Sequence, residues 1–177
     1  MKPRPEGRVL ADIRLLLTDI DGVLTDGLIH IDGAGQEVKS FHVHDGAGLV
    51  YWHRAGGLSG FVSGRRSKVV TERAAELGVH ELHLGSMHKL PIVEDILARR
   101  ELLPAQVAYM GDDISDIPVL RLVGFAASVP NARPEVFDHV HHVTSVPGGH
   151  GAVREVVEIL LKARHAWDDI LRRGGVP

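Results

Sequence analysis

Two aspartates stand two positions apart in the segment Asp19-Ile20-Asp21-Gly22-Val23-Leu24-Thr25, which Thr18 joins to the apolar run 13–17. Two carboxylates this close are unfavourable neighbours unless something neutralises them. A hard cation with oxygen ligands does so, and Gly22 lets the chain turn tightly enough for backbone groups to face the same ligand. The segment therefore indicates a cation site. An Asp-rich turn after a strand is the alternative that the segment alone leaves open.

A second acidic cluster follows another apolar run, 107–110. It contains Asp112, Asp113 and Asp116 within five residues. Some of these carboxylates could cap the helix expected to start near residue 114. Three aspartates exceed what a cap needs, and a metal ion shared with Asp19 explains the surplus.

Two further polar groups stand at the borders of expected elements. Ser63, with Gly64 and Arg65, follows a second apolar run and precedes a helix, where a hydroxyl and free backbone N–H groups suit a phosphate oxygen. Lys89 stands at the start of a later helix. Taken singly, an ordinary Ser-Gly turn and a solvated lysine are the alternatives.

The elements that must position these residues alternate along the chain. Strands are expected at 13–17, 58–62, 80–84, 107–110, 124–127 and 139–143, and helices at 47–55, 67–77, 89–100, 114–122 and from 152 to about 172. A β-hairpin at about 27–43, with a turn at Asp32-Gly33, is inserted after the first strand. This order predicts an α/β fold with a doubly wound parallel sheet. Ligands of such sheets bind at the carboxyl ends of the strands, where Asp19, Ser63 and Asp112 stand.

Composition limits the classes of protein. The chain has 177 residues, 44% apolar and 24% charged, which fits one globular domain spanning 1–177. A net charge of −3 gives no general affinity for nucleic acid or anionic membranes. The lack of cysteine excludes disulfides, thiolate metal sites and thiol nucleophiles. The polar first residues and the lack of an apolar run near 20 residues favour a cytoplasmic enzyme.

The segments DIDGVLT, VSGR, HK and GDDISD occur in the order of the four motifs of the haloacid dehalogenase superfamily of phosphohydrolases, which the chain resembles. The resemblance implies that Asp19 is the nucleophile and forms an aspartyl-phosphate. It implies that Asp21 protonates the leaving alcohol and then activates water for hydrolysis. An aspartate at this second position resembles phosphatases and phosphomutases and differs from the dehalogenases.

The same resemblance implies a Mg²⁺ ion held by the Asp19 side chain, the Asp21 carbonyl and Asp112. Asp113 and Asp116 would support these ligands from behind or replace them. A separate pair, Ser63 and Lys89, would hold the oxygens of the transferring phosphoryl group.

Spacing within the chain leaves no room for a cap domain. Between Asp19 and Ser63 there is room for the hairpin and one helix, and between Ser63 and Lys89 for one helix and one strand. A capless site is open to water, and similar proteins cover it with a neighbouring subunit. We therefore expect a homo-oligomer, with the hairpin as the assembly element. A closed ring, a tetramer in the related subgroup, would follow.

Over residues 15–164 the chain resembles one capless subgroup, which hydrolyses 3-deoxy-D-manno-octulosonate 8-phosphate in lipopolysaccharide sugar synthesis. The shared stretches are DGVLTDG, FHVHDGAG, SGRRSKVV, AYMGDDISDIPVL and GGHGAVREV. By motif position, Arg65 and Arg73 would bind the sugar acid, with Asp45 and Gly46 at the mouth of the site. A solvated helix face is the alternative for each arginine.

The chain departs from this subgroup in one loop. The subgroup has Asn-Val-Arg-Asp-Gly where this chain has His42-Val43-His44-Asp45-Gly46, and a further arginine is replaced by Val50. His42 and His44 thus take the place of other substrate-binding groups, and a nine-carbon ester such as 2-keto-3-deoxynononate 9-phosphate stays an alternative substrate.

Two other functions are weighed against this one. The lack of a cap disfavours a phosphomutase, which must hold a reorienting intermediate. A non-catalytic oligomerisation or regulatory module, like those fused to sugar nucleotidyltransferases, would not need Asp19, Asp21, Ser63 and Lys89 together.

Overall fold

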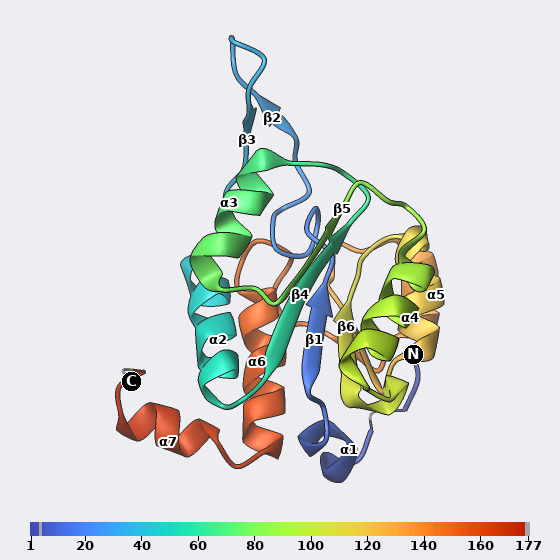
Figure 1. Cartoon of the computed structure of the whole chain (residues 1–177), viewed down its shortest axis with the longest axis vertical. Coiled ribbons are helices and arrows are strands. Elements are labelled where there is room, and N and C mark those ends of the chain that lie inside the picture. Colours follow the sequence, from blue (N-terminus) through green and yellow to red (C-terminus); the bar gives the residue numbers. More distant parts are fainter. Residues whose placement is uncertain (4, 176–177) are drawn as a thin grey trace.

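A six-stranded parallel sheet forms the centre of the protein (Figure 1), in a computed structural model that describes residues 1–3 and 5–175. The strands are β1 (Leu15–Thr18), β4 (Leu58–Ser63), β5 (Glu81–Leu84), β6 (Val107–Met110), β7 (Phe125–Ser128) and β8 (His142–Val143). Their order is β5-β4-β1-β6-β7-β8, and every neighbouring pair is parallel. The predicted α/β fold with a parallel sheet is confirmed. Because the strand order reverses between β1 and β6, ligands are expected at the carboxyl ends of these two strands.

Helices cover both faces of the sheet, as a doubly wound topology requires. Figure 1 shows α2 (Val43–Arg54), α3 (Lys68–Leu77) and α6 (Ala152–Ala163) on one side of the strands, with α4 (Lys89–Arg100) and α5 (Ile117–Leu122) on the other. The core lies between these layers. All four residues of β1 are buried, and α6 buries one apolar stripe at helical spacing that consists of Val153, Val156, Val157, Leu160 and Leu161. Burial of each such side chain contributes about 1.5–3 kcal/mol.

The predicted hairpin consists of β2 (His30–Ile31) and β3 (Glu37–Val38), which pair antiparallel and project from the body of the protein (Figure 1). Asp32 stabilises its turn, because Oδ1 accepts hydrogen bonds from the backbone N–H groups of Ala34 and Gln36, both at 2.8 Å. Only this hairpin and α2 separate β1 from β4, and only α3 and β5 separate β4 from α4, in the part of the chain described. The prediction of a fold without a cap domain is confirmed.

Several predicted boundaries are wrong. The predicted helix from 152 to about 172 is two helices, α6 and α7 (Trp167–Arg172), because His165 between them adopts a left-handed φ of 56°. The predicted helix 114–122 begins as a 3₁₀ turn, η2 (Ile114–Asp116), before α5. The predicted strand 139–143 is mostly not a strand: residue 139 ends the 3₁₀ segment η3 (Pro134–His139), residues 140 and 141 are irregular, and β8 keeps the last two residues.

Two further short helices were not predicted from the sequence. They are α1 (Gly7–Ala11) and the 3₁₀ turn η1 (Pro104–Gln106), and each spans only a few residues, too few to show a helical period. Among residues 1–3 and 5–175, no helix combines the length and the apolar character that crossing a membrane requires.

Candidate active site

Three aspartates converge at the carboxyl ends of β1 and β6. Asp19 directly follows β1, and its backbone N–H donates to the carbonyl of Met110, the last residue of β6, at 2.8 Å. Asp112 lies two residues after β6, and Asp116 lies in η2. One carboxylate oxygen from each of the three aspartates lies within 4.8 Å of the others. The two acidic clusters of the sequence therefore form one site.

Asp116 is fully buried, and both of its carboxylate oxygens are saturated with hydrogen bonds. Its Oδ1 accepts from Lys89 Nζ and from the Tyr109 hydroxyl, both at 2.6 Å. Its Oδ2 accepts from the backbone N–H groups of Asp112 and Asp113, both at 3.0 Å. Four bonds fill the acceptor sites of a carboxylate. Asp116 thus anchors the site and has no lone pair left for a metal, whereas Asp19 and Asp112 do.

Lys89 brings a buried positive charge to the nucleophile predicted from the sequence. Its Nζ lies 3.1 Å from Asp19 Oδ2 and 2.6 Å from Asp116 Oδ1. Burial lowers the pKa of Lys89, but the negative charges of Asp19 and Asp116 outweigh burial and raise that pKa above its ordinary value. The ammonium therefore stays charged beside the carboxylate, where it can hold a phosphoryl oxygen.

The residues present fit a divalent cation. Burial, followed by the neighbouring carboxylates, raises the pKa of Asp112 to about 8. Burial also raises the pKa of Asp19 to about 7, against the opposing effect of Lys89. Asp112 Oδ1 is buried and has no hydrogen-bond partner within the described part of the chain. Carboxylates that resist ionising together, one of them with a free buried oxygen, suit a hard cation.

Gly22 is required for this arrangement. Its φ of 96° is left-handed, and a Cβ at this position would lie 2.0 Å from Asp112 Oδ2. Asn131 holds the same turn, because its Nδ2 donates to the Gly22 carbonyl at 2.9 Å and its Oδ1 accepts from Gly148 N–H at 2.8 Å. Only a residue without a side chain allows Asp112 to approach the turn after β1.

The carboxylates open into a pocket of about 320 Å³. Of the residues predicted from the sequence, those that line it are Asp19, Asp21, Ser63, Arg65, Lys89, Asp112 and Asp113. Four lining residues were not predicted: Met87, Ser115, Asn131 and Arg133. Asn131 and Arg133 follow β7 as Asp112 follows β6, so their position after a strand was a usable indication.

The loop that differs from the related subgroup lies outside this pocket. Asp45 is buried and accepts hydrogen bonds from the backbone N–H groups of Gly151 at 3.3 Å and Arg154 at 2.8 Å, so it caps the first turn of α6. His42 caps α2, because its Nδ1 accepts from His44 N–H at 3.2 Å. In this chain these side chains bind the starts of two helices.

The two predicted arginines are placed differently. Arg65 lines the pocket, and its Nη2 lies 3.0 Å from Glu37 Oε1 of the hairpin. Arg73 lies on α3, with Nη1 2.7 Å from Glu76 Oε2 and its guanidinium 5.7 Å from the centre of the Phe41 ring. The structure thus brings Arg65 to the site. Arg73 and Gly46 lie away from it. These two residues are close to each other, since a Cβ added to Gly46 would lie 2.4 Å from Arg73 Nη2.

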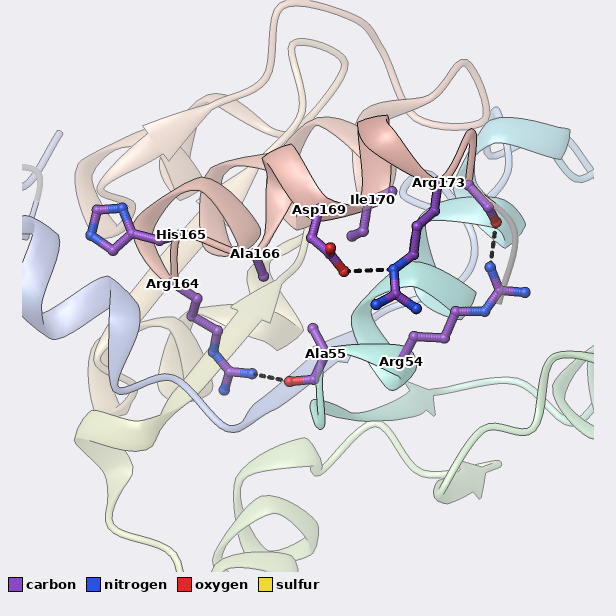
Figure 2. Close-up of a pocket in the computed structure, with 9 residues that line it drawn as sticks. Arg54, Ala55, Arg164, His165, Ala166, Asp169, Ile170 and Arg173 are labelled. Atoms are coloured by element: carbon purple, nitrogen blue, oxygen red, sulfur yellow. Dashed lines mark hydrogen bonds and ion pairs between the residues drawn. The ribbon is translucent and has the colours of Figure 1, made fainter.

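A second cavity, of about 560 Å³, lies where α2 and α6 end and α7 packs (Figure 2). Arg164 donates to the Ala55 carbonyl at 3.1 Å, Arg173 pairs with Asp169 at 3.0 Å, and Arg54 donates to the Gly175 carbonyl. Each arginine is thus committed to a group of the protein itself. The pocket at Asp19 is the candidate active site.

The fold and this site define a class of hydrolase. The family model of haloacid dehalogenase-like hydrolases matches residues 64–156, and the chain belongs to this family. The predicted resemblance to the superfamily is confirmed.

Relatives within the family are more specific. The chain is 42% identical over 154 residues to the 3-deoxy-D-manno-octulosonate 8-phosphate phosphatase of Yersinia pestis, covering 87% of this chain and 82% of that protein. It is 40% identical over 158 residues to the phosphatase of the same name from Escherichia coli K12, covering 89% and 84%.

Two solved structures are similar over most of both chains. That of the Yersinia pestis phosphatase has a TM-score of 0.89 at 40% identity and covers 92% of this chain and 88% of that chain. That of the Moraxella catarrhalis phosphatase, in complex with a magnesium ion, a phosphate ion and a KDO molecule, has a TM-score of 0.92 at 35% identity and covers 94% and 96%. The predicted resemblance to this subgroup is confirmed.

We expect Mg²⁺ to stabilise the protein more at pH 8 than at pH 5. The folded-state pKa values of Asp19 and Asp112, about 7 and about 8, exceed the ordinary value of 3.8. At a pH between the ordinary pKa and these raised pKa values, the folded protein keeps protons that the unfolded chain has released. The stability that these bound protons contribute is therefore lost as the pH rises through this range. A cation competes with those protons. At saturation, Mg²⁺ should raise the melting temperature by about 5 °C at pH 8 and by much less at pH 5.

Thermal unfolding of three variants checks the assignment of the ligands. Asp112→Asn removes the expected ligand and Gly22→Ala displaces it, so both should lose most of the Mg²⁺-dependent shift. Gly33→Ala is the matched control, because no atom lies within 4 Å of its added Cβ and its φ is not left-handed. An undiminished shift in Asp112→Asn would contradict the site.

Proposed function

We propose that this chain is a Mg²⁺-dependent phosphate monoester hydrolase that acts on 3-deoxy-D-manno-octulosonate 8-phosphate. The observation that carries the proposal is the 3.1 Å contact between Lys89 Nζ and Asp19 Oδ2 in a pocket that Asp21, Ser63 and Asp112 also line. A nucleophilic carboxylate, a proton-transfer group and a phosphate-binding cation are thereby collected in one place. The relatives of the same name, similar over more than four-fifths of the chain, support the substrate.

In the first step, Asp19 attacks phosphorus, so that a bond forms from its carboxylate oxygen as the bond to the ester oxygen breaks. Asp21 donates a proton to the departing alcohol. In the second step, Asp21 takes a proton from the water that attacks the aspartyl-phosphate, which releases phosphate and restores Asp19. Lys89 and Ser63 hold the phosphoryl oxygens throughout.

Asp19, Asp112 and the carbonyl of Asp21 would hold Mg²⁺. When bound, Mg²⁺ offsets negative charge on the phosphoryl group and on the carboxylates around it. The other acidic residues have supporting roles in this proposal. Asp116 positions Lys89, and Asp113 holds the start of η2 through Ile114 N–H at 2.8 Å.

Arg65 is the proposed partner of the substrate carboxylate, because it lines the pocket and its guanidinium can bind a carboxylate through two hydrogen bonds. The remaining proposed substrate-binding residues lie outside the pocket: His42, His44, Asp45, Gly46 and Arg73. Asp45 and Gly46 are buried, so of these five residues only His42, His44 and Arg73 could contact the substrate of a neighbouring copy of the chain. A nine-carbon sugar-acid phosphate stays the alternative substrate.

We propose a homotetramer, assembled through the hairpin. The exposed apolar side chains of the hairpin are Leu28, Ile29, Ile31 and Val38, each at least half-exposed. A projecting element with four such side chains suits an interface between copies, and closed rings are the usual result of repeated identical contacts. The proposal also places the enzyme in the cytoplasm.

A phosphate-release assay with Mg²⁺ tests the reaction. Asp19→Asn should lower turnover by about 10³-fold or more, because the nucleophile is lost. Asp21→Asn should lower it by about 10²–10⁴-fold, because proton transfer is lost. Asp138→Asn is the matched control, since this carboxylate is exposed on η3 and should leave turnover unchanged. Full activity of Asp19→Asn would overturn the proposal.

The same assay over a set of sugar and sugar-acid phosphates tests the substrate. We expect the octulosonate ester to be preferred by orders of magnitude. A preference for the nononate ester would mean that this ester is the substrate. A flat profile would show that the altered His42–His44 loop has relaxed specificity.

Sedimentation or light scattering tests the assembly. The expected species is four times the 19.2 kDa chain. Replacing Ile29 and Ile31 by serine should shift it to smaller species, because the apolar contact is lost. Leu171→Ser is the matched control, as this leucine is equally exposed but lies on α7. A monomeric wild-type protein would contradict the proposal.

A further inference from the structure

Lys39 carries a buried positive charge next to the active site. It follows β3 in the hairpin, and its side chain is only 1% exposed. Its Nζ forms an ion pair with Asp21 Oδ1 and lies 3.3 Å from Glu37 Oε1. An ammonium group is removed from water at high cost unless it is paired. The ion pairs with these two carboxylates therefore stabilise the buried ammonium group of Lys39.

The hairpin places the ammonium group of Lys39 beside Asp21. Glu37 and Lys39 are two residues apart, so they lie on the same face of the extended chain, while Val38 between them points to solvent. Glu37 is itself held at the body of the protein, because Oε1 accepts from Arg65 Nη2 at 3.0 Å and Oε2 accepts from the Ser67 hydroxyl. The lysine is thus clamped between a fixed carboxylate and Asp21.

Asp21 has no other hydrogen-bond partner for its carboxylate within residues 1–3 and 5–175. It lies in the turn after β1 and lines the pocket, with 20% of its side chain exposed. A carboxylate on a turn, without a partner, can occupy several rotamers. The contact with Lys39 is what selects one of them.

We propose that Lys39 is a positioning residue, which holds the carboxylate of Asp21 in the orientation that proton transfer to the leaving alcohol requires. This inference rests on the proposed function, in which Asp21 is the acid and base. General acid catalysis needs the carboxyl group within hydrogen-bond reach of the oxygen that it protonates. Lys39 does not line the pocket, so it acts through Asp21 and not by binding the phosphate.

Two esters with different leaving groups separate these roles. A sugar phosphate releases an alkoxide that must be protonated, whereas p-nitrophenyl phosphate releases a stable anion that needs no proton. We expect Lys39→Met to lower kcat/KM for 3-deoxy-D-manno-octulosonate 8-phosphate by about 10–100-fold. The value for p-nitrophenyl phosphate should change by less than about threefold. The ratio of the two values does not depend on how much of the variant is folded, since the same active enzyme acts on both esters.

Three further variants complete the test. Lys39→Arg keeps the charge and should restore most of the ratio. Lys68→Met is the matched control, because this exposed lysine at the start of α3 makes no contact with Asp21, and it should leave the ratio unchanged. In an Asp21→Asn background, Lys39→Met should have almost no further effect on the sugar phosphate, because the group that it positions is already gone.

The outcomes distinguish the inference from the proposed function. Equal losses for both esters, or a full additional loss in the Asp21→Asn background, would overturn the positioning role and assign Lys39 to folding or phosphate binding. Release of phosphate from neither ester by the wild-type protein would instead overturn the proposed function, and with it this inference.

Discussion

The buried carboxylate of Asp116 is the interaction on which the rest of the site depends. It holds the ammonium of Lys89 against Asp19 and at the same time fixes the backbone of Asp112 and Asp113. One side chain therefore fixes both the ammonium group proposed to bind phosphate and the backbone of the proposed metal ligand Asp112. Gly111 is part of the same constraint, since a Cβ there would lie 2.4 Å from the Asp116 carboxyl carbon. The site tolerates so much buried charge because every anchor bond of Asp116 is made.

The pairing of the parallel strands is enough to bring these groups together. Because β1 and β6 are neighbours in register, Thr18 beside Met110, the residues that follow them must meet. The hairpin adds Glu37 and Lys39 to the site, and Glu37 pairs with Arg65, which follows β4. The loop that differs from the related subgroup contributes to the scaffold instead, since Asp45 caps a helix more than a hundred residues further along the chain.

Most of the fold and the centre of the site could be predicted from the sequence, for physical reasons. Alternating apolar runs and amphipathic stretches predict an α/β fold with a doubly wound parallel sheet. The rule that carboxyl ends of strands meet then places Asp19, Ser63 and Asp112 together. Lys39 could not be found in this way. A lysine in a hairpin is normally solvated, and Lys39 is buried only because the residue after β3, at the base of the hairpin, lies against Asp21. Two further contacts form only in the folded protein and could not be predicted. The sequence indicates Tyr109 as a core strand residue and gives no sign that it binds Asp116. The cap that Asp45 provides for α6 is likewise a tertiary contact. The break at His165 was equally hidden, since a left-handed histidine leaves no periodic trace.

Reductive trapping of the phosphorylated enzyme tests most directly whether Asp19 is the nucleophile. Borohydride reduces an aspartyl-phosphate to homoserine, and peptide mass spectrometry then locates the modified residue. With p-nitrophenyl phosphate and Mg²⁺, the leaving group needs no proton, so Asp21→Asn slows mainly hydrolysis of the intermediate. We predict homoserine at residue 19 and nowhere else. Modification at another aspartate, or phosphate release by the wild-type enzyme with no modified residue in either protein, would contradict the account.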